Sequence, residues 1–375
     1  MREIIDLLIF TQKNGASDLF LSVGNPPIIR LNGDLVTHKS PPLEASELKQ
    51  MLYSIMTDHQ RAEYERELEL DFSFVLGQEY RFRVNCFNTL NGAAAVMRTI
   101  PTQIKSLDQL EAPEIFKKLA GLHKGLILVT GPTGSGKSTT LAAMVDHVNV
   151  NSAKHIITIE DPIEFVHPSK KSLVNQREVG RDTKSYARAL KSALREDPDV
   201  ILVGELRDIE TIQLALTAAE TGHLVMGTLH TSSAPKTIDR IIDVFPADSK
   251  EMVRAMLSVS LEAVISQALL KRRTGGRIAA HEIMLGTGAI RNLIRRGQVP
   301  QMYSTMQMNR KIGMCTMEDS VMTLVEENVI TEETAREVLD TSTSEGEESH
   351  DEKDAKNTKQ ANANSAFKVK NPTKF

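Results

Sequence analysis

A glycine-rich segment near the middle of the chain has the residue types and spacing to bind phosphate. It consists of Gly131, Pro132, Thr133, Gly134, Ser135, Gly136, Lys137, Ser138 and Thr139. Residues 131–138 fit the pattern G-x-x-x-x-G-K-[ST], in which glycines let consecutive backbone N–H groups turn inward around phosphate oxygens. A helix that starts here adds a dipole that favours negative charge. The pattern predicts that Lys137 reaches the β- and γ-phosphates of a nucleotide and that the Ser138 hydroxyl reaches Mg²⁺.

Two further segments carry the carboxylates that nucleotide hydrolysis needs, one to orient or deprotonate water and another to help hold the metal. The first is an apolar run that ends in three acids: Glu160, Asp161 and Glu164. The second, residues 199–205, is an aliphatic run that ends in Glu205. Ligands of open α/β sheets bind at such strand ends. A single acid there is equally compatible with a solvated surface, but the four together favour a catalytic site.

Two histidines, His223 and His230, lie at opposite ends of one apolar run. Because strand side chains alternate between faces, their odd separation puts them on opposite faces, so they are not expected to share a metal. His230 lies at the carboxyl end, where a γ-phosphate would be. Its spacing is equally compatible with sensing or orienting that phosphate and with a structural role.

Two arginines, Arg83 and Arg98, belong to neighbouring strand-like runs. If Asn91-Gly92 forms a two-residue turn, Asn85 pairs with Arg98, and Arg83 lies on the same face one pleat away. The arginines then converge on one surface. The alternatives are a solvated sheet face and a longer loop with another register.

The composition narrows the class of protein. A chain of 375 residues suggests two domains plus tails, and a net charge of −4 gives no basic excess for a nucleic-acid partner. Only Cys86 and Cys315 are present, so neither a four-cysteine zinc site nor a disulfide framework is expected. The first residues lack a signal-peptide cleavage pattern, and no run is long enough to cross a bilayer. We therefore expect a soluble, intracellular protein.

Residues 1–100 are expected to form a mixed α+β domain, with a hairpin at Asn32-Gly33. The predicted helices cover a first segment from Ile4 and residues 45–56 and 58–67. The predicted strands cover residues 17–23, 28–31, 34–36, 72–76, 80–87 and 93–99. A connector, residues 101–121, contains a helix near 113–122.

Residues 122–340 alternate strands and helices, which indicates a parallel sheet covered on both faces. The predicted strands cover residues 125–130, 155–159, 200–203, 224–228 and 277–284. The predicted helices cover residues 139–148, 185–194, 208–220, 234–242, 249–270, 287–297, 316–327 and 331–339. Residues 341–375 are polar, with almost nothing to bury, and are expected to be disordered.

These segments together resemble the secretion-type hexameric ATPases, specifically the PilT family of type IV pilus retraction ATPases. The resemblance covers nearly all of residues 1–340. The matching segments are GPTGSGKST (131–139), ITIEDPIEF (157–165), DPDVILVGELRD (197–208), TGHLVMGTLHTSSAPKTIDRIID (221–243) and AIRNLIR (289–295). The last looks like the hallmark of retraction motors.

The resemblance implies an α/β protein with an N-terminal PAS-like domain followed by a RecA-like P-loop ATPase domain, assembled as a homohexamer. It implies ATP and Mg²⁺ as ligands, with Ser138 and Glu205 at the metal, partly through water. By the family's pattern Glu164 is the catalytic base, Glu205 the Walker B acid, and His230 lies near the γ-phosphate. Arg83 and Arg98 match arginines that the N-terminal domain directs at the phosphates.

The implied function is ATP-driven pilus retraction and twitching motility, at the cytoplasmic side of the inner membrane. The implied partners are the pilus platform protein and a second retraction ATPase. The chain departs from the family at Phe20, at Cys315 and in its long tail.

Alternatives are a PilU-like accessory ATPase, which AIRNLIR disfavours, and a pilus-assembly or type II secretion ATPase, which the short first domain and two cysteines disfavour. From other classes, a non-hydrolysing nucleotide-binding regulatory module is disfavoured by Lys137, Glu164 and Glu205. A nucleic-acid translocase is disfavoured by the charge balance.

Overall fold

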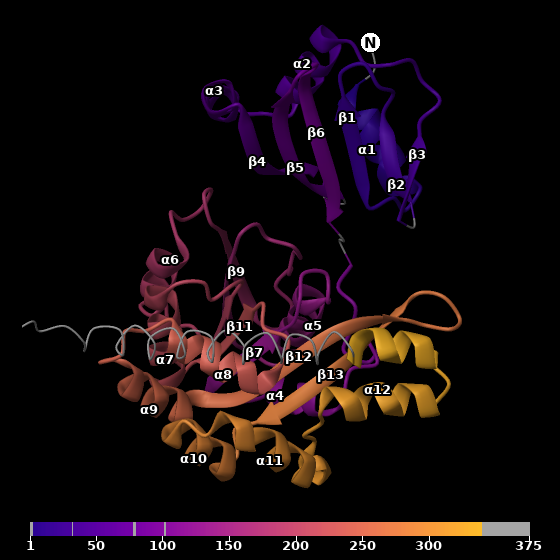
Figure 1. The fold of residues 1–375 in the computed structure, drawn as a ribbon. Coiled ribbons are helices and arrows are strands. Elements are labelled where there is room, and N and C mark those ends of the chain that lie inside the picture. Colours follow the sequence, from indigo (N-terminus) through magenta and orange to yellow (C-terminus); the bar gives the residue numbers. More distant parts are fainter. Residues whose placement is uncertain (1–2, 32, 78–79, 101–102, 340–375) are drawn as a thin grey trace, which may run out of the picture. The chain divides into compact units, whose positions relative to one another are not determined.

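The computed structural model describes residues 3–31, 33–77, 80–100 and 103–339, and the predicted disorder of 341–375 lies outside these ranges. It contains a six-stranded and a seven-stranded sheet with helices packed beside them (Figure 1). The predicted α/β class is confirmed.

The first sheet is antiparallel, in the strand order β3-β2-β1-β6-β5-β4. Its strands are β1 (Asp18–Ser22), β2 (Ile28–Leu31), β3 (Asp34–Thr37), β4 (Glu69–Leu76), β5 (Tyr80–Thr89) and β6 (Gly92–Ile100). Its helices are α1 (Ile4–Lys13), α2 (Ala45–Ser54) and α3 (Asp58–Glu67). Side chains from several of these elements are fully buried in a shared apolar core, among them the side chains of Leu8, Leu52, Phe82 and Met97.

The β5–β6 hairpin has a different register from the predicted one. Thr89 pairs with Gly92, so Leu90 and Asn91 form the turn and Arg83 lies directly opposite Arg98. The Thr89 side chain holds this turn by donating to Gly92 O at 2.8 Å and accepting from Asn91 N at 3.3 Å. Because the register differs by two residues, the two arginines still share a face, as predicted.

The second sheet has the strand order β13-β12-β7-β11-β10-β8-β9. Its strands are β7 (Gly125–Thr130), β8 (His155–Glu160), β9 (Leu173–Glu178), β10 (Val200–Val203), β11 (Leu224–Leu229), β12 (Leu261–Lys271) and β13 (Arg277–Leu285). The pairs β7–β11, β7–β12, β8–β10 and β8–β9 are parallel, and β12–β13 is antiparallel. The strands β7, β10 and β11 are buried along their whole length, as parallel strands between covering helices should be.

Helices separate these strands and close the described part of the chain. They are α4 (Ile115–Ala120), α5 (Lys137–Asn151), α6 (Tyr186–Ala193), α7 (Ile209–Glu220), α8 (Ala234–Asp243), α9 (Lys250–Ser260), α10 (Gly288–Arg296), α11 (Met302–Met308), α12 (Met317–Glu326) and residues 332–339. Within the described ranges, none of the helices is long and apolar enough to span a membrane.

The predicted helix over 249–270 is wrong in its second half, because α9 ends at Ser260 and β12 follows at once. The strand pairs with β7 on one side and β13 on the other, and residues 263–267 are buried without alternation, so the segment shows no period of two. Gly275 and Gly276, with φ of +90° and +80°, make the turn between β12 and β13 rather than a helix end. The sequence patterns also missed β9 and α11.

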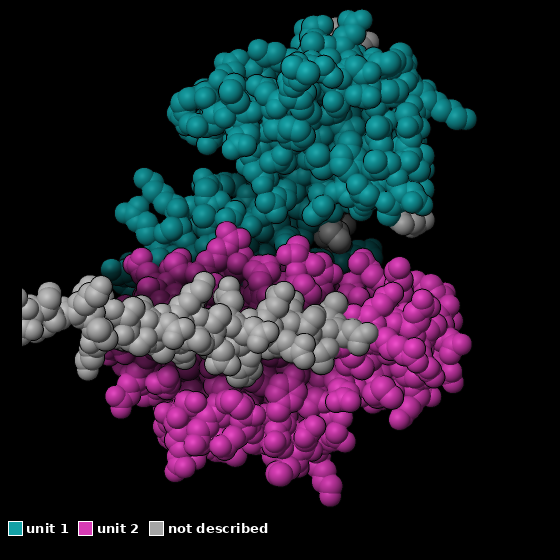
Figure 2. Space-filling model, in the orientation of Figure 1, with its two compact units in different colours: residues 1–106, 141–204 teal, residues 107–140, 205–375 magenta. Residues whose placement is uncertain are grey.

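The chain forms two compact units, residues 1–106 with 141–204 (unit 1) and residues 107–140 with 205–375 (unit 2), coloured teal and magenta in Figure 2. The first sheet lies in unit 1. The division of the chain into domains at 1–100, 101–121 and 122–340 stays a prediction.

Candidate functional site

The glycine-rich segment forms the loop between β7 and α5, as the pattern predicts. Gly131, Gly134 and Gly136 have φ of +139°, +83° and +89°, values that side chains disfavour. Lys137 begins α5 and folds back over the loop, where its Nζ donates to Gly131 O at 2.8 Å and Pro132 O at 3.0 Å. The lysine charge is therefore held at the mouth of the loop, beside the N-terminus of a 15-residue helix.

The loop offers hydrogen-bond donors that suit a phosphate group. Residues 132–134 are exposed, whereas Ser135 is buried. Ser135 Oγ has no hydrogen-bond partner among the described residues. A buried hydroxyl without a partner, beside a lysine and a helix N-terminus, indicates an anion-binding cradle.

Glu205 and His230 are brought together in unit 2. Leu206 N donates to Thr228 O at 3.0 Å, which joins the segment after β10 to β11. Glu205 Oε1 then lies 3.3 Å from His230 Nε2, and Glu205 Oε2 lies 2.7 Å from Arg207, a partner that the sequence patterns did not single out. Figure 1 shows α7 and α8, the helices that follow these two segments.

The surroundings of Glu205 keep it ionised. Partial burial favours its neutral form, but the ion pairs with Arg207 and His230 outweigh that effect and lower the pKa of Glu205. The same three side chains, together with Arg240, line a pocket whose remaining wall is mainly aliphatic. The pocket thus places one charged carboxylate among two arginines and a histidine. The carboxylate is suited to bind a metal ion, and the nitrogens of the other three side chains are suited to orient a phosphate.

Glu164 lies in unit 1 and is exposed. Its backbone N donates to Glu160 Oε2 at 3.4 Å. Glu160 also accepts from Thr158 Oγ1 at 2.7 Å, and burial raises the pKa of Glu160 to about 6. Of the acids predicted here, Glu160 is therefore held by hydrogen bonds within the chain, whereas Asp161 and Glu164 are both exposed and accessible to a ligand.

Arg83 and Arg98 each have a carboxylate partner. Arg83 donates to both oxygens of Asp71, at 2.6 and 3.2 Å, and Arg98 Nε donates to Asp18 Oδ1 at 2.9 Å. The hydrogen bond to Asp71 raises the pKa of Arg83, and the charges of Asp161 and Glu164 act in the same direction. Arg83 therefore lies within electrostatic reach of the segment that carries Glu164.

These arginines belong to one row of charges across the first sheet. Arg30, Asp18, Arg98 and Arg83 stand directly opposite one another on β2, β1, β6 and β5. Like charges opposite each other destabilise a sheet, and the acids relieve that repulsion. The arginines are thus fixed on one face, as predicted, but already bound to acids that the sequence patterns did not identify.

A buried acid that was also missed, Glu178 at the end of β9, connects the same sheet with the Glu164 segment. Its carboxylate accepts from Ser73 Oγ at 2.9 Å, from Arg81 at 3.0 Å and from Ile163 N at 3.1 Å. Arg81 and Glu178 side chains are only 10% and 7% exposed. The residue before Glu164 is therefore held by a nearly dry ion pair.

Two departures from the family pattern have a local explanation. The Arg30 guanidinium lies 5.3 Å from the centre of the Phe20 ring, a cation–π contact. Cys315 pairs with Ile283 through its backbone, and burial raises the pKa of its thiol to about 11. Both are packing features rather than parts of the candidate site.

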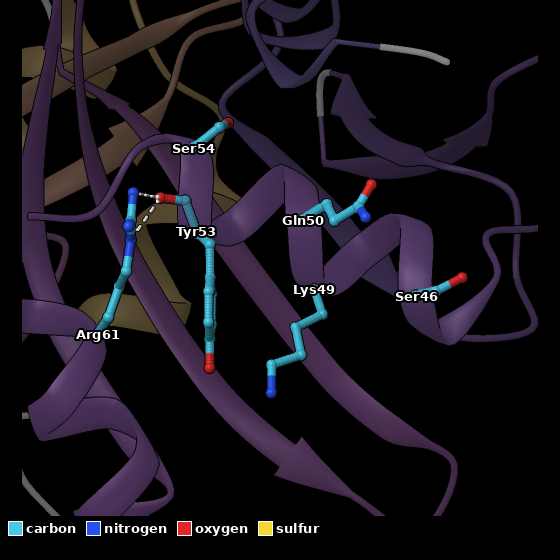
Figure 3. Close-up of a pocket in the computed structure, with 6 residues that line it drawn as sticks. All are labelled: Ser46, Lys49, Gln50, Tyr53, Ser54 and Arg61. Atoms are coloured by element: carbon cyan, nitrogen blue, oxygen red, sulfur yellow. Dashed lines mark hydrogen bonds between the residues drawn. The ribbon is translucent and has the colours of Figure 1, made fainter. Parts of the chain in front are cut away.

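A second hollow lies over α2 and is lined by Lys49, Tyr53 and Arg61 (Figure 3). Arg61 is turned toward the helix end, where it donates to Tyr53 O at 3.1 and 2.8 Å. The hollow contains none of the predicted site residues.

The candidate residues are thus divided between the units. The loop 131–139, Glu205 and His230 lie in unit 2, and Glu164, Arg83 and Arg98 lie in unit 1. A phosphate loop between a buried parallel strand and a helix, with an ionised acid after another strand, defines a P-loop nucleotide-binding protein of RecA-like fold.

Comparisons with known proteins point to one family. Residues 3–371 match the family model described as "Type II/IV secretion system protein". The chain is 59% identical to the type IV pilus retraction ATPase PilT of Pseudomonas aeruginosa over 335 residues, 89% of this chain and 97% of that protein. It is 60% identical to a twitching motility protein of Neisseria gonorrhoeae over 311 residues, 83% of each.

A crystal structure of the pilus retraction motor PilT with bound ADP superposes with a TM-score of 0.85 at 47% identity, covering 90% of this chain and 97% of that chain. The chain belongs to the type II/IV secretion system protein family and, within it, to the PilT family of ATPases.

Proposed function

We propose that this chain is an ATP-hydrolysing motor that powers the retraction of type IV pili. The observation that carries the proposal is the phosphate loop capped by Lys137 in the same unit as the ionised Glu205. The names of the relatives given above supply the cellular process.

In the proposed site the loop 131–139 binds the phosphates of ATP through its backbone N–H groups and Lys137. Ser138 and Glu205 would hold Mg²⁺, Glu205 partly through water. Among the described residues no group of three or more His, Cys, Asp or Glu side chains could form a metal cage, and Mg²⁺ held by phosphates needs none. When bound, Mg²⁺ would neutralise charge that develops on the phosphate oxygens.

Glu164 is proposed as the base that takes a proton from the attacking water, because it is exposed and follows a backbone segment fixed by Glu178. His230 would orient the γ-phosphate and keep Glu205 in place. Arg83 and Arg98 would stabilise negative charge on the transferred group. Arg83 would have to exchange Asp71 for phosphate, which makes its engagement dependent on a bound nucleotide.

At the level of assembly, we propose a homohexamer on the cytoplasmic side of the inner membrane, bound to the pilus platform protein and working with a second retraction ATPase. The motif 289–295 favours the retraction motor over a PilU-like accessory ATPase. Intact Lys137, Glu164 and Glu205 favour a hydrolase over a regulatory module that only binds nucleotide.

Phosphate release by the purified full chain tests the enzymatic part. Lys137→Ala and Glu164→Gln should each abolish release, and Glu220→Gln, an exposed acid at the end of α7, should not change it. Full activity in either of the first two variants would refute the assigned site.

Deletion of the gene, followed by imaging of surface pili, tests the cellular part. Many pili with lost surface motility would support retraction. A strain without pili would instead indicate an assembly motor.

A further inference from the structure

A side chain outside all the sequence motifs supports the phosphate loop from the sheet. Gln267 lies on β12 and is 2% exposed. The last residue pair between β7 and β12 is Thr130 with Ser266, so Gln267 is one residue further along, beside the start of the loop.

Both ends of the Gln267 amide are used. Nε2 donates to Ser135 O at 2.5 Å, and Oε1 accepts from Thr140 Oγ1 at 2.8 Å. Ser135 belongs to the loop and Thr140 to the first turns of α5, so one buried amide joins the loop, the helix and the sheet. A flipped amide would place Oε1 against Ser135 O, so the contacts fix its orientation.

The bond to Ser135 O determines where the next N–H points. In a planar trans peptide the C=O and the following N–H point in opposite directions. With Ser135 O held by Gln267, the N–H of Gly136 is directed away from β12. This is the direction that an inward-turned N–H needs in order to meet a phosphate oxygen.

The glycines show how closely the loop lies against this residue. A Cβ on Gly136 would come within 2.8 Å of Gln267 Nε2, and a Cβ on Gly131 within 2.3 Å of Gln267 O. Positive φ alone would allow an occasional Asn, but a Cβ on Gly131 would collide with the backbone of β12, and a Cβ on Gly136 would displace the Gln267 amide. The loop and Gln267 therefore fit each other as a pair.

We propose that Gln267 is a positioning residue for phosphate binding, which holds the 135–136 peptide so that its N–H faces the nucleotide. The inference rests on the proposed nucleotide site. It adds to that site a residue that lies 132 positions after Ser135 in the sequence. Gln267 itself has no contact with the nucleotide.

The test uses the full chain and a fluorescent ADP analogue. Gln267→Met keeps the length and removes both hydrogen bonds, and it should raise the Kd for the analogue about tenfold or more, because Ser135 O loses the donor that fixes the 135–136 peptide. Gln267→Glu should also raise the Kd near pH 8. Its affinity should partly recover near pH 5 relative to wild type, because a protonated carboxyl can donate to Ser135 O.

The matched control is another buried amide, Asn149 at the far end of α5, which donates to Pro168 O at 2.9 Å and accepts from Lys170 N at 3.0 Å. Asn149→Asp should lower the melting temperature but leave the Kd within twofold. A Gln267→Met protein that melts cooperatively and binds with wild-type Kd would overturn the inference and leave the proposed function standing. A wild-type chain that does not bind the analogue would overturn both.

Discussion

The surroundings of two acids, Glu205 and Glu160, shift their pKa values in opposite directions. Glu205 lies between Arg207 and His230, which lower its pKa, whereas burial raises the pKa of Glu160 to about 6. Opposed shifts of two acids mark a division of roles. Glu205 is suited to stay charged beside a cation, and Glu160 to hold the Glu164 segment through hydrogen bonds.

Glu160 makes stability depend on pH. Its folded-state pKa of about 6 lies above the ordinary value of 4.5, so the folded chain holds the proton more tightly than the unfolded chain. This contribution is complete below pH 4.5 and is lost as the pH rises through 6. Relative to Glu160→Gln, the wild type should therefore lose on the order of 1–2 kcal/mol of unfolding free energy between pH 5 and 8.

Denaturant unfolding at several pH values measures this difference. Glu220→Gln serves as the control, because Glu220 is exposed and is not among the groups that shift the pKa of Glu160. A wild-type minus Glu160→Gln difference that is flat from pH 5 to 8 would contradict the expectation.

The residues predicted from the sequence are those that local patterns mark. Lys137 follows a glycine pattern, and Glu205 and His230 each end an apolar run. Gln267 and Glu178 carry no such mark, because their partners lie 132 residues away in one case and 97 in the other. Such contacts exist only once strands distant in sequence have become neighbours.

At the scale of elements, the helix α10 is fixed by its own motif residue Arg291. Arg291 Nε donates to Gly286 O at 2.6 Å, and its terminal nitrogens reach Ser258 O at 3.2 Å and Glu262 at 2.8 Å. Carbonyls at a helix C-terminus attract cations, so this arginine caps α9 from α10. One arginine of the segment 289–295 is therefore a structural connection between helices.

Arg291→Ala should reduce the unfolding free energy by about 2 kcal/mol or more, because it leaves several partly buried acceptors without a donor. Arg295→Ala, on the exposed side of the same helix, should change it by no more than about 0.5 kcal/mol. Thermal melting of the two variants makes the comparison. Equal effects would show that Arg291 is no anchor.

The Arg81–Glu178 pair ties β5 to β9. Removing one partner of a nearly dry ion pair leaves the other charge uncompensated, so Arg81→Met should destabilise on the order of 3 kcal/mol. Arg83→Met on the same strand removes an ion pair with a side chain 43% exposed, and should cost about 1 kcal/mol or less. Denaturant midpoints distinguish the two, and recovery in the double variant Arg81→Met with Glu178→Gln would confirm the cause.

The two strands that the sequence patterns missed, β12 and β9, share one physical feature. Residues 261–271 and 173–178 take their form from strand pairing rather than from their own periodicity. The helices that were predicted well carry local signals. Ser185, Asp208 and Thr287 each accept a backbone hydrogen bond at the start of α6, α7 and α10.

At the scale of the whole molecule, nucleotide binding and folding must be linked. A ligand that binds only the folded state at a concentration 100 times its Kd adds about 2.7 kcal/mol, which corresponds to a rise in melting temperature of about 5–10 °C. Wild type should show this rise with ADP, and Lys137→Ala should not. An equal rise in both would place the nucleotide somewhere other than the loop 131–139.

Unit 2 is also braced by a buried acid on β13. Glu282 is fully buried and accepts from Ala234 N at 2.7 Å, Tyr303 Oη at 3.0 Å and Met317 N at 3.3 Å. These donors begin α8, lie in α11 and begin α12. One carboxylate thus joins the helix after His230 with the two helices that follow the 289–295 segment.

Two adjacent residues of β12 serve different loops. Ser266 donates to Ser232 O at 2.9 Å, two residues beyond His230, while Gln267 holds the phosphate loop from the opposite face of the strand. Loss or gain of a single residue within β12 would exchange these faces and detach both loops at once. The turn at Gly275 and Gly276, where a Cβ would meet open space, has no such constraint. In natural variation of this protein, length changes should therefore be excluded from β12 and collect at the turn that follows it.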